Sequence, residues 1–314
     1  MTKYLLNRIL QTVLIVVIVS VISFLLVSIM PKDPVYALIG ADATEEDYWT
    51  TYYRLGLDKP LFIRYFNWAA SVVIGDFGTS YAYNLPVWEV LGPKLAVTIY
   101  LSVAAMLISF PLGIILGIIS AVKRGKMSDT VITLIANLMS GIPQFVVAIC
   151  LLYLFSMKLR LLPAIGFIFP WEDFPRHIQQ IILPLTCLVL QSAAGICRQT
   201  RSSMLEAYGQ DYVRTARSKG LKEGFIIYKH VMGNGLIPII TLIGGRLSSL
   251  IGGAMFVEAV FSIPGMGSLM VTAINSMDIP VIQATVLVTA VVISAAYIIT
   301  DILYVIVDPR ISLN

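Results

Sequence analysis

The chain has 314 residues, of which 58% are hydrophobic and 13% are charged, and its mean hydropathy is +0.85. A soluble protein of this length would carry far more charge on its surface, so the composition excludes an ordinary soluble domain and indicates a membrane protein. The net charge of +4 is too small to indicate a nucleic-acid partner.

The apolar segments predict an all-α membrane protein with about six transmembrane helices, because one span needs about 20 apolar residues. The first segment follows the basic residues Lys3 and Arg8. Its apolar run is too long for a signal peptide, and no cleavage site of small residues follows it, so we expect a retained anchor. The six segments cover residues 9–30, 95–122, 131–156, 181–197, 236–256 and 280–307.

The distribution of lysine and arginine predicts the orientation of these spans. With the N-terminus inside, the cytoplasmic segments carry 13 Lys and Arg against 5 Asp and Glu, whereas the outer segments carry 8 against 11. We therefore expect both termini in the cytoplasm. The chain then divides into an anchor helix (1–30), an extracytoplasmic segment (31–94), a transmembrane core (95–307) with a cytoplasmic insert (198–235), and a tail (308–314).

The extracytoplasmic segment is long for an outer loop, and aromatic and charged residues alternate in it. Such a pattern suits a structure at the level of the lipid headgroups. It is interpreted either as a docking scaffold for an extracytoplasmic partner or as an interfacial helix that braces the bundle. The residues concerned are Glu45, Glu46, Asp47, Tyr48, Trp49, Tyr52, Tyr53, Tyr65, Phe66 and Trp68.

The insert carries the most informative stretch, DYVRTARSKGLKEGFIIYKHVMGNGLIP at 211–238. It predicts a basic amphipathic helix, a break at Gly220, and a second helix. Val213, Ala216 and Gly220 fall at helical spacing and offer a small face for close approach. A membrane protein needs no such insert to turn around, so we expect a docking surface for another protein. The alternative is a solvated basic loop.

Charged residues inside the spans are costly and suggest a function. Arg246 and Asp301 lie about 15 Å and about 9 Å from the cytoplasmic ends of the fifth and sixth spans. We expect an ion pair that fixes the bundle, with substrate contact as the alternative. Small residues in the fifth span allow close helix packing or leave room for a pathway. They are Gly244, Gly245, Ser248, Ser249, Gly252 and Gly253.

Several short motifs follow one another along nearly the whole chain. They are LLNRILQTV near the start, LGLDKPL at 55–61, GDFGTS at 75–80, YVRTARSKGL at 212–221, NGLIP at 234–238, PGMG at 264–267, DIPVIQ at 278–283 and DPR at 308–310. Together they resemble the inner-membrane permease subunits of binding-protein-dependent ABC importers, in the dipeptide, oligopeptide and nickel branch. Where that family has Glu-Ala-Ala, this chain has Arg214-Thr215-Ala216. The docking role implied by the resemblance therefore does not depend on a glutamate at that position.

The resemblance implies a type I ABC importer permease fold in the plasma (inner) membrane of a prokaryote, in the lipid bilayer as a multi-pass protein. It implies half of a translocation pathway for di- or oligopeptides, with nickel or a metal chelate as the alternative cargo. The implied partners are a second permease subunit in a heterodimer, two ATPase subunits that bind ATP and Mg, and an extracytoplasmic substrate-binding protein.

The resemblance also assigns residues to roles. The insert becomes a coupling helix that enters a groove of an ATPase subunit, and the loop after the fifth span becomes part of an outer gate. The alternative for Glu258 is that it is a residue at a helix end that contacts the lipid headgroups. The coupling residues are Arg214, Thr215, Ala216, Arg217, Lys219, Gly220 and Leu221. The gate candidates are Met255, Phe256, Glu258, Ser262, Pro264, Gly265 and Gly267.

Other activities find little support in the sequence. The pair Gly125-Lys126 lacks the upstream glycine and the Ser or Thr of a phosphate-binding loop, so ATP hydrolysis is expected on another chain. An intramembrane enzyme is not expected, because His177 and His230 lie outside the predicted spans and no catalytic motif occurs. A stand-alone secondary transporter predicts inverted repeats, which are not evident. Cys150, Cys187 and Cys197 predict no disulfide framework or metal site.

Overall fold

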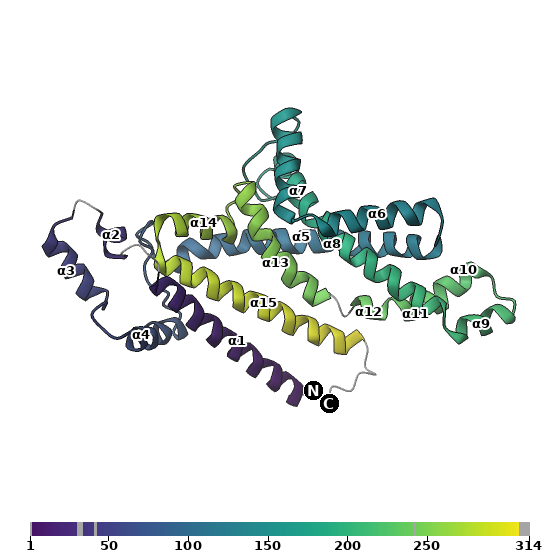
Figure 1. Ribbon diagram of the computed structural model, residues 1–314, viewed down its shortest axis with the longest axis horizontal. Helices are drawn as coiled ribbons and strands as arrows, with labels where there is room; N and C mark the ends of the chain where they lie inside the picture. Colours follow the sequence, from purple (N-terminus) through teal and green to yellow (C-terminus); the bar gives the residue numbers. More distant parts are fainter. Residues whose placement is uncertain (1, 30–33, 41–42, 241–242, 308–314) are drawn as a thin grey trace. The chain divides into compact units, whose positions relative to one another are not determined.

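The computed structural model describes residues 2–29, 34–40, 43–240 and 243–307 (Figure 1). Regular structure in these ranges is helical, apart from one isolated bridge between Thr79 and Pro86. By packing, the chain forms a first unit (Met1–Thr98 with Pro264–Ala295) and a second unit (Ile99–Ile263 with Ala296–Asn314). The division by topology given above remains a prediction, and its tail, 308–314, lies outside the described residues.

The first unit contains four helices before the long helix α5. α1 packs against α4, where the Tyr65 hydroxyl lies 2.9 Å from Ser20 Oγ and the Phe24 ring lies 5.5 Å from that of Tyr65. Most other apolar side chains of α1 are exposed, as lipid-facing residues are. The elements are α1 (Thr2–Ser28), α2 (Pro34–Ile39), α3 (Glu45–Arg54), α4 (Leu61–Val73), the start of α5 (Val87–Val122), α14 (Met266–Ser276) and most of α15 (Ile279–Val307).

The acidic patch of the extracytoplasmic segment forms the first turn of α3. Thr44 caps this helix, and the Thr44 hydroxyl accepts a hydrogen bond from the Asp47 backbone N–H while Asp47 accepts one from the Thr44 N–H. Glu45 and Glu46 lie beside it, where negative charge favours the N-terminus of a helix. The acidic residues of this patch therefore stabilise the N-terminus of α3.

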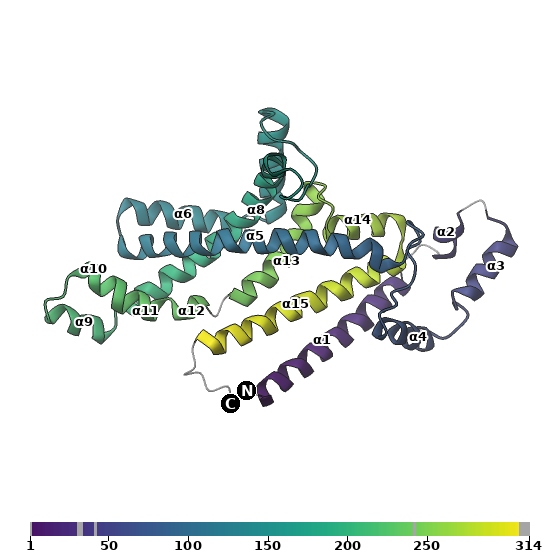
Figure 2. The same cartoon turned by 180° about the vertical axis from the view of Figure 1, so that it is seen from behind.

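The second unit contains the rest of α5 and the chain up to Ile263. Figure 2 shows the same helices from behind; in both views α9 and α10 lie beyond the C-terminal end of α8, away from α7. The elements are α6 (Met127–Gly141), α7 (Gln144–Leu151), the π-helix η1 (Leu152–Lys158), α8 (Phe174–Tyr208), α9 (Asp211–Ser218), α10 (Glu223–Phe225), the π-helix η2 (Ile226–Val231), α11 (Met232–Gly235), α12 (Ile237–Ile240) and α13 (Ile243–Val260).

Among the described residues, four helices are long and apolar enough to cross a membrane, or up to six if two bent pairs each count as one span. The third predicted span coincides with one of these pairs, which is bent by 103° between Gly141 and Gln144. The reason is Pro143, which lacks an N–H and forces Ile142 into an extended conformation.

The structure describes the fourth predicted span in full and the fifth in part. The fourth is longer, because α8 continues past Cys197 to Tyr208 and so supplies the first part of the insert. The fifth falls on α12 (Ile237–Ile240) and α13 (Ile243–Val260), and residues 241–242 between them lie outside the described residues. The second bent pair consists of α13 and α14.

Within the second unit, α5 and α8 pack through a Gly-x-x-x-Gly pair that the sequence analysis missed. A Cβ atom at Gly113 would lie 2.6 Å from the Cβ of Ile196, and one at Gly117 would lie 2.5 Å from the Cβ of Thr200. One turn before Gly113, Ser109 Oγ donates to Ser192 Oγ at 3.1 Å. Small residues thus bring the two helix backbones together, as in many membrane-helix pairs.

Candidate functional site

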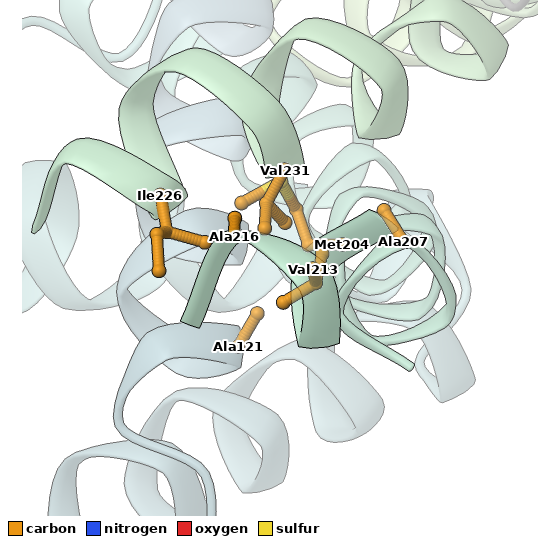
Figure 3. Packing of buried hydrophobic residues seen from close by; sticks show 7 residues of the cluster. All are labelled: Ala121, Met204, Ala207, Val213, Ala216, Ile226 and Val231. Atoms are coloured by element: carbon orange, nitrogen blue, oxygen red, sulfur yellow. The ribbon is translucent and has the colours of Figure 1, made fainter. Parts of the chain in front are cut away.

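The insert folds as the sequence predicted, as a helix, a glycine break and a second helical stretch. Gly220 has φ +71°, a left-handed conformation that glycine adopts without strain. Val213 and Ala216, however, do not offer a small face to a partner. They are buried in an insert cluster within this chain (Figure 3). Its members are Ala121, Met204, Ala207, Val213, Ala216, Ile226 and Val231.

This burial has a physical cause. α9 has only eight residues, too few for a helix that is stable alone in water. Its apolar side therefore packs on the end of α8 and on η2, with Ala216 in the buried cluster. The opposite side remains exposed and carries Arg214, Thr215 and Lys219, followed by Gly220 and Leu221. Together with Arg217, which is also exposed, these residues are the part of the predicted coupling set that another protein can touch.

Arg217 joins the two arms of the insert. Its Nη2 and Nε donate to the Glu223 carboxylate at 2.7 and 3.2 Å, and the Tyr208 hydroxyl donates to the same carboxylate at 2.5 Å. The guanidinium also lies 5.1 Å from the centre of the Tyr208 ring. Hydrogen bonds from Arg217, and then from Tyr208, hold the pKa of Glu223 below its ordinary value. Arg217 therefore holds the two arms of the insert together through contacts within this chain.

A second polar network ties the turn between α5 and α6 to α8. Asp129 accepts from Arg201 Nε and Nη2 at 2.8 and 3.0 Å, and from the Gly125 N–H at 3.0 Å and Ser120 Oγ at 2.5 Å. Such a two-pronged pair is among the stronger ionic contacts. Sequence analysis counted these residues only as charges, because nothing in the pattern pairs residues 72 positions apart.

In the first unit, the motifs GDFGTS and DIPVIQ meet. The Ser80 hydroxyl donates to the buried carboxylate of Asp278, which also accepts from the Ala82 N–H at 3.1 Å. Asp278 precedes α15 and accepts a further contact from the Val281 N–H at 3.4 Å, as a cap does. Burial, and then the nearby Asp278 charge, raise the pKa of Tyr81. One carboxylate thus anchors the 79–86 loop to the start of α15.

Replacing Asp278 by asparagine is expected to loosen this anchor. The asparagine keeps the shape but loses the charged acceptor, which is worth about 1.5–3 kcal/mol for a buried hydrogen bond. We expect a lower thermal midpoint of the detergent-purified protein and faster proteolysis within 79–86. Asp58→Asn is the control, because Asp58 is exposed. Equal midpoints for the two variants would contradict the anchor.

The gate candidates fall on both sides of the boundary between the units, which lies between Ile263 and Pro264. Glu258 is completely buried, so the alternative role at the headgroups is wrong. Phe256 is 63% exposed, and Ser262 is exposed with φ +50° at the end of α13. Met255 and Pro264 are half-buried, and Gly265 and Gly267 are buried. Their role as a gate stays a prediction.

Arg246 lies against α8. Its two terminal nitrogens would be 2.6 Å from a Cβ at Gly195, so the guanidinium rests directly on the backbone there. It also lines a cavity of about 270 Å³ in the second unit. The predicted pairing of Arg246 with Asp301 stays a prediction.

The remaining candidate chemistry is limited. His177 lies near the start of α8, where it is buried and hydrogen-bonded to Tyr100 and the Ile168 carbonyl at 2.9 and 2.5 Å, which indicates a packing role. Within the described residues, no group of three or more His, Cys, Asp or Glu side chains is placed to hold a metal ion.

Comparison with known proteins covers nearly the whole chain. Residues 113–313 match the family described as binding-protein-dependent transport system inner membrane component, and residues 1–102 match the N-terminal family of such components. A Brucella abortus protein named as a peptide transport system permease is 37% identical over 312 residues, 99% of each chain. The dipeptide transport system permease protein of Alkalihalophilus pseudofirmus is 33% identical over 335 aligned positions, again covering 99% of each chain.

Proposed function

The chain belongs to the family of inner-membrane components of binding-protein-dependent transport systems, and we propose that it forms half of the pathway by which such an importer moves di- or oligopeptides. The observation that carries the peptide assignment is the similarity over 99% of the chain to permeases named for peptides. Nickel or a metal chelate is the other cargo suggested by the sequence, and the names of these relatives favour peptides over it.

The energy source is assigned to other chains. Two ATPase subunits would bind ATP and Mg, a second permease subunit would supply the other half of the pathway, and an extracytoplasmic binding protein would deliver the peptide. The insert is proposed as the contact for one ATPase, on the exposed side of α9 with Arg214 and Lys219. The insert cluster and the Arg217–Glu223 pair support this role, because they make the insert one rigid body joined to α8.

The test is peptide uptake by the complete transporter. The chain is co-purified with its partner subunits and reconstituted in proteoliposomes with the binding protein outside. We expect uptake of a radiolabelled dipeptide that requires both ATP and the binding protein. A complex that hydrolyses ATP but takes up a nickel chelate and no peptide would overturn the peptide assignment.

We also propose that the end of α13 belongs to an outer gate. Ser262 is exposed and ends the helix, while Glu258 one turn earlier is buried, so movement of α13 would change the surroundings of Ser262. In a background without Cys150, Cys187 and Cys197, Ser262→Cys is expected to react with a membrane-impermeant thiol reagent at rates that differ several-fold between the resting and ATP-trapped transporter. Equal rates would favour a passive rim.

A further inference from the structure

The second unit contains a cavity that is lined largely by polar side chains. Its volume is about 270 Å³, and it is lined by residues of α6, α7, α8 and α13. Ligand sites in proteins begin at about 300 Å³, so this one can receive the end of a small molecule and not the whole of a large one. Arg198 and Ser249 in its lining are exposed, so the cavity is open to the outside of the chain.

The charged side chains that are described in the lining of this cavity are all positive. Arg198 and Arg246 both line it, and no Asp or Glu is among the described residues that do so. The two guanidinium groups repel each other, and that of the half-buried Arg246 is costly to hold inside a membrane protein. An anion that enters offsets both effects. Guanidinium groups bind carboxylates with matched, two-pronged geometry.

Glycines place the polar groups of this cavity. Arg246 reaches across from α13 and rests on Gly195 of α8, where any Cβ would collide with its guanidinium. In the same way, the Gln144 amide occupies the space beside Gly253 of α13 that a Cβ would need. Two long polar side chains are thus held against neighbouring helix backbones, and Gln144 adds a neutral hydrogen-bonding group beside the two arginines.

We propose that this cavity binds the terminal carboxylate of the peptide during its passage, with Arg246 and Arg198 as its charge partners. The inference rests on the proposed function, and it adds a chemical preference located in the permease itself. A peptide whose carboxylate is replaced by an amide loses the attraction of both guanidinium groups. The preference for the free acid therefore belongs in part to this chain, in addition to any preference of the binding protein.

The test compares uptake of two radiolabelled probes, alanyl-phenylalanine and its C-terminal amide, by the complete transporter in proteoliposomes. The same binding protein is used for every variant, so a change in the acid-to-amide uptake ratio arises in the permease. Arg246→Gln is expected to lower that ratio about tenfold, as the loss of one hydrogen bond to a charged group does. Arg246→Lys is expected to retain part of the preference.

Gly195→Ala is the sharper variant. It keeps both charges but displaces the Arg246 guanidinium, so it is expected to lower the ratio in the same direction. Gly245→Ala is its matched control, because a Cβ there meets no atom within 4 Å and Gly245 is the neighbour of Arg246 on α13. We expect the control to keep the wild-type ratio.

The outcomes separate the two proposals. If the wild-type transporter hydrolyses ATP normally but takes up neither probe, the proposed function is overturned, and this inference with it. Normal wild-type uptake with an unchanged ratio in Gly195→Ala and Arg246→Gln would overturn the inference alone. If Arg246→Gln fails to assemble and Asp301→Leu restores it, the Arg246–Asp301 ion pair is supported and the cavity assignment is overturned.

Discussion

Replacement of Gly117 by alanine is expected to destabilise the second unit severely, although it adds only one methyl group. The new Cβ would lie 2.5 Å from the Cβ of Thr200 and 2.7 Å from the Cys197 carbonyl oxygen, a backbone atom that cannot rotate away. α5 and α8 must then separate. Overpacking of this kind costs about 1–3 kcal/mol, and more where backbone has to move.

The measurement is the thermal midpoint of the detergent-purified protein together with its yield. Gly92→Ala is a matched control, since Gly92 lies in the same helix α5 and a Cβ there meets nothing within 4 Å. Alanine should be neutral or stabilising at that position, by up to about 1 kcal/mol from helix propensity. If both variants melt at the same temperature, close packing at Gly117 does not hold α5 against α8.

Replacement of Gly220 by valine is expected to uncouple ATP hydrolysis from transport. At φ +71° a β-branched residue is strongly disfavoured, so the turn between the arms of the insert must change shape. The exposed side of α9 then no longer fits the ATPase. Because coupling between two sites is typically worth about 1–3 kcal/mol, stimulation of ATP hydrolysis by the loaded binding protein should fall about fivefold or more.

Two further variants sharpen this experiment. Gly224→Ala is the control, because Gly224 has space for a Cβ and an ordinary φ. Arg214→Gln removes a charge from the exposed side and leaves the insert cluster intact, so it tests contact without strain. Wild-type stimulation and uptake in both Gly220→Val and Arg214→Gln would remove the insert from the coupling assignment.

The features that were predicted best from the sequence are those that depend on many residues of one segment together. A run of 20 apolar residues reflects the thickness of the bilayer, so the order of the membrane segments followed from hydropathy alone. The helix, break and helix of the insert followed from Gly220 and its flanking periodicity. The bend at Pro143 has a sequence signal, a proline within an apolar run, which the prediction of the third span did not use.

Pairings between single distant residues could not be predicted. Ser80 and Asp278 are 198 positions apart, and a lone serine and a lone aspartate carry no periodic signal that connects them. The direction in which α9 faces was misread for a related reason. Val213 and Ala216 mark an apolar side, but the pattern does not say whether that side meets the same chain or another.

For the proposed contact with an ATPase subunit, the burial of that apolar side would also influence how fast the importer assembles. Because α9 is ordered by contacts inside its own chain, an ATPase subunit encounters a finished surface and not a segment that must fold on arrival. The conformational entropy of the insert is lost when the permease folds, not at the encounter. Association should therefore be a simple second-order docking step, proportional to ATPase concentration and slowed by salt that screens Arg214 and Lys219.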